Sequence, residues 1–352
     1  MSTARTALLA LAACACAPTL DKDAPAKDVD LTDDVGIGSD DGDGADGGED
    51  GGEDGGDGGT GDDGPAFEYD CDAPIDEVVE HQVLDWARGY HGLLFDDEGQ
   101  ILGWDGRNAM VHATYDGESS TWLPGISNSE QLLRAMDGGV YYMSSERSTL
   151  FHITPEGAET AVASGFYYGY GLTWGPDGNI YIADGDVQRF NPETGELTVI
   201  VSKPRDESWW SHSLGFNLDS TVLYVGTIGS GQILEIALDD NLDPVGEPEV
   251  FAWLPGGWLD AMEMDACGNL WVPDYYSSTL FRVDPEGNST AMVDISERLY
   301  GHGVAWGNNV GGWRPDAIYQ PLPYNRNEVR ELVIGVPDGR TVRTWKGERF
   351  SL

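Results

Sequence analysis

The feature that most constrains the fold is a unit of about 40 residues that recurs six times from residue 91 onward. Each unit opens with a polar residue or a tyrosine, followed by a short apolar run, a turn and a second apolar run. The units begin 39, 40, 42, 48 and 42 residues apart. Helical repeats of this length would need long amphipathic stretches, which the sequence lacks. The period therefore predicts an all-β fold, a six-bladed β-propeller with four strands per blade.

The residue that opens each unit is called a ring position here, because closure of the units into a ring would bring all six to one mouth. The ring positions are His91, Glu130, Tyr170, His212, Asp260 and His302. In all six, the side chain is of a type that binds metals or takes part in acid–base chemistry. The ring positions are therefore the candidate site.

The strands can be assigned within a unit from the apolar runs and turns. A glycine marks the first turn in four units, and an Asp-Ser step replaces it in the fourth; these turns are Gly99, Gly138, Gly178, Asp219-Ser220 and Gly268. The third unit predicts strands at 172–174, 180–183, 187–190 and 197–201, and the fifth at 262–264, 270–272, 279–283 and 290–293. The segment 78–84 is predicted to be the outer strand of the sixth blade, which would leave no sheet edge open.

The first residues have the pattern of an export signal. Arg5 precedes an apolar stretch from Ala7 to Ala13 that is too short to span a bilayer. The sequence Leu11-Ala-Ala-Cys14 fits the processing site of a bacterial lipoprotein, with residues 1–13 as the signal peptide and Cys14 as the lipidated residue. An ordinary secretory signal without lipid is the alternative. By resemblance to other bacterial lipoproteins, Ala15 suggests anchoring at the outer membrane or cell surface.

Residues 14–65 are predicted to be a disordered acidic tether, which leaves 66–352 for the propeller. Between residues 21 and 64 there are 17 acidic residues, two lysines and no aromatic residue. Such a segment cannot bury enough apolar surface to offset its ordering entropy. The whole chain has a net charge of −43, which argues against nucleic acid or anionic lipid as a partner. We expect a monomer that meets the membrane only through its lipid anchor.

Two cysteines, Cys71 and Cys267, fall within the predicted propeller. In an oxidising compartment they can form a disulfide that ties the N-terminal segment to a distant blade. Two unpaired thiols are the alternative, because the sequence does not give the distance between them.

Two of the units carry a longer motif. They read Gly171-Leu-Thr-Trp-Gly-Pro-Asp-Gly-Asn-Ile-Tyr-Ile-Ala-Asp184 and Leu259-Asp-Ala-Met-Glu-Met-Asp-Ala-Cys-Gly-Asn-Leu-Trp-Val-Pro-Asp274. These segments resemble blades of the SMP-30/gluconolactonase superfamily of six-bladed propellers, a resemblance that covers roughly residues 75–335. The superfamily includes lactonases, phosphotriesterases, lyases and plain binding modules, so the motif is specific for architecture rather than for activity.

The resemblance implies a divalent cation at the mouth of the central channel, held by Glu, Asn and Asp residues from different blades. Asp260 matches the family's Asp. His91 and His212 stand where the family has a metal-binding Glu and Asn, and Tyr170 stands where it has an Asn on the substrate side. Calcium prefers hard oxygen ligands, whereas His91, His212, His302 and Asp260 would suit zinc, iron, manganese or nickel. A water-filled polar channel without metal is the alternative.

Aromatic residues precede the ring positions. They are Tyr90, Tyr168, Trp210, Trp258 and Tyr300, with Tyr167 and Trp209 beside them. We expect them to wall a funnel above the ring and to bind a small molecule such as a sugar, a lactone or an aromatic compound. The alternative is that one or two of them pack between blades.

Three functions follow as hypotheses. The first is a metal-dependent hydrolase of the lactonase or esterase kind, with Glu130 as general base and Tyr170 as donor to the developing oxyanion. The second is a surface-displayed propeller that binds a ligand without turnover. The third is a zinc lyase, by resemblance to the six-bladed peptidylglycine amidating lyases, in which His91, His212 and His302 would be ligands and Tyr170 the base.

Overall fold

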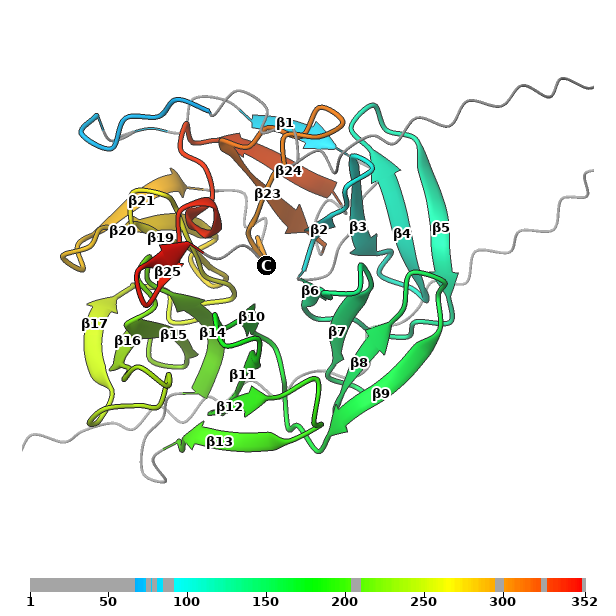
Figure 1. Cartoon of the computed structure of the whole chain (residues 1–352). Coiled ribbons are helices and arrows are strands. Elements are labelled where there is room, and N and C mark those ends of the chain that lie inside the picture. Colours follow the sequence, from blue (N-terminus) through cyan, green and yellow to red (C-terminus); the bar gives the residue numbers. More distant parts are fainter. Residues whose placement is uncertain are drawn as a thin grey trace, which may run out of the picture. The chain divides into compact units, whose positions relative to one another are not determined.

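The six-bladed, all-β propeller predicted from the repeat is confirmed by the structure, a computed structural model. It describes residues 67–73, 77, 81–84, 92–203, 210–294, 301–323 and 328–349. In these residues all strands but the last two form six antiparallel sheets of four strands each, and these six sheets stand around a common centre (Figure 1). The compact unit to which they belong extends from Asp63 to Leu352.

The first three blades follow the chain in order, from the innermost strand outward. Blade 1 contains β2 (Leu94–Phe95), β3 (Gln100–Trp104), β4 (Ala109–Thr114) and β5 (Ser119–Pro124). Blade 2 contains β6 (Leu132–Arg134), β7 (Val140–Ser144), β8 (Thr149–Ile153) and β9 (Glu159–Ser164). Blade 3 contains β10 (Leu172–Trp174), β11 (Ile180–Asp184), β12 (Asp186–Phe190) and β13 (Leu197–Val201).

The next blades repeat this order, and the last one departs from it. Blade 4 contains β14 (Trp210–Phe216), β15 (Val222–Ile228), β16 (Gln232–Ala237) and β17 (Glu249–Trp253). Blade 5 contains β18 (Glu263–Met264), β19 (Leu270–Asp274), β20 (Thr279–Val283) and β21 (Ser289–Asp294). Blade 6 contains β22 (Ala305–Trp306), β23 (Ala317–Leu322), β24 (Glu328–Val333) and, outermost, β1 (His81–Leu84).

The sixth blade joins the two ends of the propeller. Strand β1 pairs antiparallel with β24, with His81 opposite Leu332 and Leu84 opposite Val329. An N-terminal strand therefore completes a sheet built from the last part of the chain, as was predicted for the segment 78–84. This pairing covers the edge that β24 would otherwise expose.

The turns between the first two strands explain the recurring glycines. The φ angles of Gly99, Gly138, Gly178 and Gly268 lie between 75° and 85°, a left-handed conformation that glycine adopts without strain. In blade 4 the same place is taken by Ser220, with a φ of 58°. The Ser220 hydroxyl donates a 2.9 Å hydrogen bond to the carbonyl of Thr344, so this turn receives a contact from the C-terminal segment.

Neighbouring blades are joined by tryptophan side chains that donate to a backbone carbonyl next door. Nε1 of Trp174 in blade 3 lies 2.7 Å from the carbonyl oxygen of Arg134 in blade 2. Nε1 of Trp313 in blade 6 lies 2.9 Å from that of Gly99 in blade 1. Each indole buries apolar area between two sheets and satisfies its N–H there.

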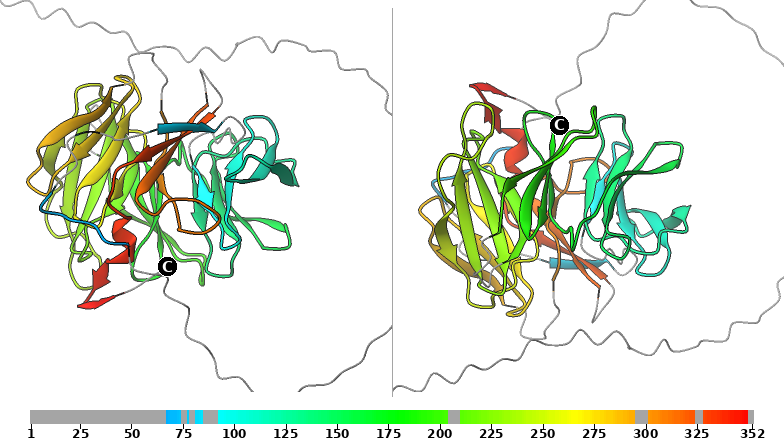
Figure 2. Two further views of the ribbon diagram at one scale, coloured as in Figure 1. Left: turned by 90° about the horizontal axis from the view of Figure 1, so that it is seen from above. Right: turned by 90° about the horizontal axis from the view of Figure 1, so that it is seen from below.

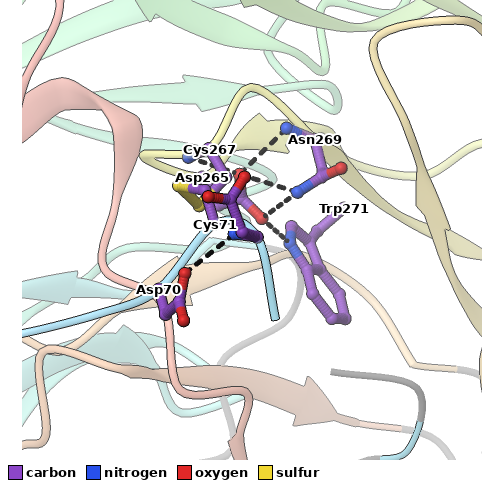
Figure 3. Close-up of a disulfide and its surroundings, with 7 residues drawn as sticks. Asp70, Cys71, Asp265, Cys267, Asn269 and Trp271 are labelled. Carbon is purple, nitrogen blue, oxygen red and sulfur yellow. Dashed lines mark hydrogen bonds between the residues drawn. A yellow bond between two sulfur atoms is a disulfide. The ribbon is translucent and has the colours of Figure 1, made fainter. Parts of the chain in front are cut away.

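A disulfide links the segment before β1 to the first turn of blade 5 (Figure 3). Cys71 and Cys267 are 196 residues apart in sequence, and their Cα atoms are 5.4 Å apart. Beside the bond, the buried carboxylate of Asp265 accepts from the backbone N–H of Cys267 and of Asn269, each at 2.9 Å, and from Nε1 of Trp271 at 2.9 Å. The disulfide therefore holds the chain just before β1 against a rigid turn.

The C-terminal segment follows blade 6 and lies at one end of the ring. It contains the 3-10 helix η1 (Gly339–Thr341) and the hairpin of β25 (Thr344–Trp345) and β26 (Glu348–Arg349). The backbone of Asp338 forms an isolated antiparallel β-bridge with that of Asp265. The backbone N–H of Thr344 donates a 2.7 Å hydrogen bond to the carbonyl of Leu218.

Both of these contacts are to first turns, where the inner strands of blades 4 and 5 end, whereas the ring positions precede the inner strands. The segment therefore lies at the end of the channel opposite to the ring positions. Figure 2 shows it at one end of the propeller. Within the described ranges, no helix is long and apolar enough to cross a membrane.

Candidate functional site

Four ring positions each form the same kind of backbone hydrogen bond. In each, the N–H donates to a carbonyl of the second strand of its own blade. The pairs are Glu130 to Met143 at 2.8 Å, Tyr170 to Ala183 at 3.1 Å, Asp260 to Pro273 at 3.0 Å, and His302 to Pro321 at 3.0 Å. The repeat therefore places these residues at equivalent points, just before the inner strands.

His212 reaches the ring by a different route, because it lies inside β14. Ser211 pairs with Thr227 and Ser213 pairs with Gly226, so His212 is the extra residue of a β-bulge. Bulges redirect a side chain that regular pairing would place elsewhere, and they are common beside active sites. The His212 side chain is fully buried.

Asp260 holds two histidines, His302 and His212. Its Oδ2 atom lies 2.6 Å from Nδ1 of His302, and its backbone carbonyl lies 3.2 Å from Nδ1 of His212. Carboxylate and carbonyl oxygens only accept hydrogen bonds, so each neutral imidazole carries its proton on Nδ1 and a lone pair on Nε2. All three residues are at most 6% exposed. The structure thus fixes both histidines in the same tautomer.

Two imidazoles in this tautomer fit the predicted cation as ligands. Metal-binding histidines commonly donate their other N–H to a carboxylate or a backbone carbonyl, as His302 and His212 do to Asp260. Nitrogen donors favour zinc, iron or manganese over calcium. In the part of the chain that the structure describes, no group of three His, Cys, Asp or Glu side chains is placed to hold a metal. His91, the third predicted histidine ligand, lies outside that part.

One side of the histidine pair is lined by tyrosines. The ring of Tyr170 lies 4.0 Å from that of His212, centroid to centroid, and stacks on Tyr168 at 5.8 Å with an interplanar angle of 3°. Tyr167 continues this line to Trp210, at 5.1 Å. These side chains run from the buried ring to an exposed rim, since Tyr167 is 67% exposed.

The other side is lined by aromatic residues of blade 5. The indole of Trp258 lies edge-on to His212 at 6.2 Å, and the ring of Tyr275 lies 5.0 Å from His302. Trp258 also contacts Tyr275 and Tyr276, at 5.7 and 5.3 Å. The predicted aromatic residues Tyr168, Trp210 and Trp258 therefore stand near the histidines, joined by Tyr275, which the sequence analysis did not select.

Two buried aspartates hold the aromatic loops in place. The carboxylate of Asp274, at the end of β19, accepts from the backbone N–H of Gly256 at 2.6 Å and of Trp258 at 3.3 Å. Asp184, at the same place in blade 3, accepts from Tyr167 at 2.9 Å and from Tyr168 at 2.5 Å. Burial raises the pKa of both carboxyl groups, although the backbone donors oppose the rise. This explains the Asp that ends both quoted blade motifs.

Glu130, the predicted general base, is anchored within its own blade. Its Oε1 atom accepts a 3.0 Å hydrogen bond from Nδ2 of Asn128 and a further one from the hydroxyl of Ser145. The side chain is 4% exposed. The contacts described for this carboxylate are therefore with blade 2, whereas those of Asp260 join blades 4, 5 and 6.

Several predicted residues lie outside the described ranges. They are His91 of the ring, Tyr90, Trp209 and Tyr300 of the aromatic funnel, and Cys14 of the lipoprotein signal. The signal peptide and the acidic tether also fall there. Their roles stay predictions.

Tyr275 and the two clamping aspartates are the site residues that sequence reasoning missed. All three stand at or directly after the end of a second strand, at Asp184, Asp274 and Tyr275. The end of that strand lies beside the start of the inner one, so each propeller unit brings two positions to the mouth rather than one. A search for polar and aromatic residues at both places would have found them.

The comparisons with known proteins agree with this architecture. The sequence model of the SMP-30/Gluconolactonase/LRE-like region matches residues 99–309. No curated protein sequence matches the chain significantly. Among solved structures, a gluconolactonase from Xanthomonas campestris is 16% identical with a TM-score of 0.59, over 78% of this chain and 98% of that one.

Two further structures are similar in fold. A calcium-binding regucalcin from Agrobacterium tumefaciens is 18% identical with a TM-score of 0.59, over 75% of this chain and 97% of that one. A virginiamycin B lyase from Staphylococcus aureus is 15% identical with a TM-score of 0.53, over 72% and 99%. A histidine-to-alanine variant of this lyase is described as catalytically inactive. At these identities the likeness shows the fold alone.

Proposed function

The chain belongs to the SMP-30/gluconolactonase/LRE-like family, and from this we propose that it is a metal-dependent hydrolase of the lactonase or esterase kind. The proposed site is the channel mouth around His212, Asp260 and His302. A gluconolactonase among the structural neighbours supports this reaction class.

One observation carries the proposal: Asp260 contacts Nδ1 of both His302 and His212, and so orients two imidazoles from different blades. A channel that only holds water does not need two buried histidines with fixed tautomers. The cost of burying three such groups is offset if they bind a ligand or a cation.

The residues divide the work as follows. His212 and His302 would hold the cation through Nε2, together with His91, while Asp260 keeps the proton of His302 on Nδ1. When bound, the cation supplies Lewis-acid activation of a carbonyl or of water. Glu130 accepts the proton of the attacking water, with its Oε1 already held by Asn128.

The aromatic residues bind and orient the substrate. Tyr170 donates a hydrogen bond from its phenolic O–H to the developing oxyanion. Tyr168, Trp210 and Trp258 offer flat apolar faces beside these polar groups, an arrangement that suits a sugar lactone or an aromatic ester. The substrate proposed is thus a small neutral or weakly charged carbonyl compound.

The test combines elemental analysis with turnover of a panel of lactones and aryl esters. We expect about one zinc, iron or manganese per chain, and loss of both metal and turnover in His212→Ala. The matched control is His152→Ala, because the His152 imidazole contacts Asp137 in blade 2, at 3.2 Å. A folded, metal-free wild type that still hydrolyses the panel would remove the metal from the proposal.

A lyase is the second candidate, favoured by the contact of Tyr170 with His212 and by the fold of virginiamycin B lyase. The two reactions differ in their products. A hydrolase incorporates ¹⁸O from labelled water into its acid product, whereas a lyase breaks its substrate by elimination without water and leaves a new C=C or C=O double bond in one product. Ligand binding without either product would indicate a binding propeller.

We also propose that the chain is exported and anchored by lipid on Cys14 at the outer membrane. The disulfide between Cys71 and Cys267 supports export, because such bonds persist in oxidising compartments. In a bacterial host, Cys14→Ala is expected to move the protein from the membrane fraction to the soluble one. Wild-type protein in the soluble fraction would contradict the anchor.

A further inference from the structure

The end of the channel opposite to the histidines contains a second group of charged residues. A cavity there with about 40 Å³ of free volume is lined by Arg134, Thr173, Trp174, Glu263, Arg340 and Arg343, with Leu133. About 10–15 Å³ suffices for one water molecule. A neighbouring cavity between blades 1, 2 and 6 shares Arg134, Glu263 and Arg340 with it. The two cavities therefore adjoin at these residues, and Arg340 and Arg343 bring the C-terminal segment into their lining.

Three arginines line this cavity, in a chain that carries only 19 Lys and Arg residues and a net charge of −43. Arg340 forms an ion pair with Asp338, with Nε 2.6 Å from Oδ2. Arg134 forms an ion pair with Asp97 and a 3.3 Å hydrogen bond to the carbonyl of Phe95. These two arginines are thus already paired.

Arg343 differs from both. It is 2% exposed, and its described hydrogen bond is from Nη2 to the carbonyl of Phe216, at 3.3 Å. Its Nε atom is buried and has no hydrogen-bond partner among the described residues. Burying a guanidinium N–H donor without a hydrogen bond costs free energy, unless an anion or another acceptor binds to it.

Glu263 lines the same cavity, but no hydrogen bond or ion pair between it and Arg343 is among the contacts described. No ion pair within 4.0 Å joins Glu263 to Arg340 or Arg343 among the contacts described. Asp338 is already engaged by Arg340. The cavity therefore separates a carboxyl group from guanidinium groups and leaves room between them for a small acceptor.

Solvent can reach this space, because 47% of the Arg340 side chain is exposed at its edge. An ion could therefore enter past Arg340 and meet Arg343 inside. Guanidinium groups present several N–H donors in a plane and match the oxygen atoms of phosphate, sulfate and carboxylate groups.

We propose that this cavity binds a small oxyanion between Arg343 and Arg340, at the end of the channel away from the catalytic mouth. Oxygen atoms of the anion accept from Nε of Arg343 and from the Arg340 guanidinium. Glu263, when protonated, donates its O–H to a third oxygen. The site is independent of the proposed hydrolysis, since none of its residues contacts the histidines in the contacts described.

The site is expected to favour acidic conditions. Burial raises the pKa of Glu263 to about 7, while Arg340 and Arg343 oppose the rise and Asp338 adds to it. Arg134 also faces the cavity. Below pH 7 Glu263 is neutral and can donate, whereas above it the carboxylate repels an anion.

The test uses sulfate, whose charge is constant between pH 6 and pH 8.5. Titration calorimetry of the full chain at constant ionic strength should show one saturable site at pH 6. We expect at least tenfold weaker binding at pH 8.5, and for Arg343→Met at pH 6. Glu263→Gln should bind about equally at both pH values. The control Arg314→Met removes the same charge from the ion pair with Asp316, outside the cavity, and should leave binding unchanged.

A crystal soaked in selenate gives a second readout that does not depend on a variant folding. Anomalous scattering should place selenium between Arg340 and Arg343. No saturable heat with the wild type, selenium only at other places, or equal losses in Arg343→Met and Arg314→Met would each overturn the proposal.

Discussion

Asp260 and His302, at the start of neighbouring blades, form a 2.6 Å hydrogen bond between Oδ2 and Nδ1. Both side chains are buried, so water does not compete for this contact and the low dielectric strengthens it. The imidazole is therefore held in one orientation before any ligand arrives. The same aspartate reaches His212 through its backbone carbonyl, which makes Asp260 the residue on which both histidines depend.

Replacing Asp260 by Asn tests this dependence. The amide can still accept from His302 but lacks the charge that polarises the imidazole, so we expect metal affinity to fall about 10- to 100-fold. Competition with a chelator measures the change. Asp137→Asn is the control, because it alters another His–Asp contact, that of His152 at 3.2 Å. Equal affinities in Asp260→Asn and the wild type would show that Asp260 does not support a metal site.

The repeat made most of the fold predictable, because a blade is a local structure. The turn at Ser220 and the closing strand at 81–84 both follow from comparing units, since each has a counterpart elsewhere in the chain. The C-terminal segment from Gly339 to Arg349 could not be found in this way. It has no counterpart in the other units, and it is placed by contacts with Leu218 and Asp265 that are distant in sequence.

The sequence predicted that the ring residues would lie close together, as His212, Asp260 and His302 do, but it could not predict their geometry. The slot pattern selected His212, Asp260 and His302, yet it could not show that the carboxylate would turn to His302 rather than lie beside both histidines equally. The bulge at His212 is equally invisible to the pattern, because register depends on the neighbouring strand. Glu263 lies in an inner strand, where the sequence shows only an ordinary alternation of apolar and polar residues, so the pattern does not single it out.

Loss of the disulfide is expected to weaken the closure of the propeller. The bond spans 196 residues of sequence and holds the segment just before β1, so we expect Cys71→Ser to lower the free energy of unfolding by about 3 to 5 kcal/mol. Urea denaturation measures this loss. Cys16→Ser, which removes a thiol but leaves the disulfide intact, is the control. Identical unfolding midpoints for the two variants would mean that the disulfide contributes no stability.

Glu263 should make the free energy of unfolding of the protein fall as the pH rises. Burial raises its pKa from 4.5 to about 7, so the folded state binds more protons than the unfolded state between these values. The contribution of Glu263 to stability is therefore fully present below pH 4.5 and is lost as the pH rises through 7.

Glu263→Gln cannot ionise and should escape this loss. We expect the variant to gain stability over the wild type as the pH rises from 5 to 8, by up to about 3 kcal/mol. Urea unfolding at both pH values measures the difference. The exposed Glu249→Gln serves as control and should show no such trend. A difference in the free energy of unfolding between Glu263→Gln and the wild type that is the same at pH 5 and pH 8 would refute the raised pKa.

The Asp274 carboxylate is expected to be essential for the position of Trp258. It is 1% exposed and accepts backbone N–H bonds from Gly256 and Trp258. In Asp274→Asn the new amide N–H₂ faces these donors, so we expect a loss of about 2 to 4 kcal/mol and faster amide exchange at 256–258. Asp284→Asn is the matched control, because Asp284 accepts from Asn288 N at 2.8 Å in an exposed turn. Unchanged exchange at 256–258 would show that the loop is held by other contacts, and the aromatic wall would then not depend on Asp274.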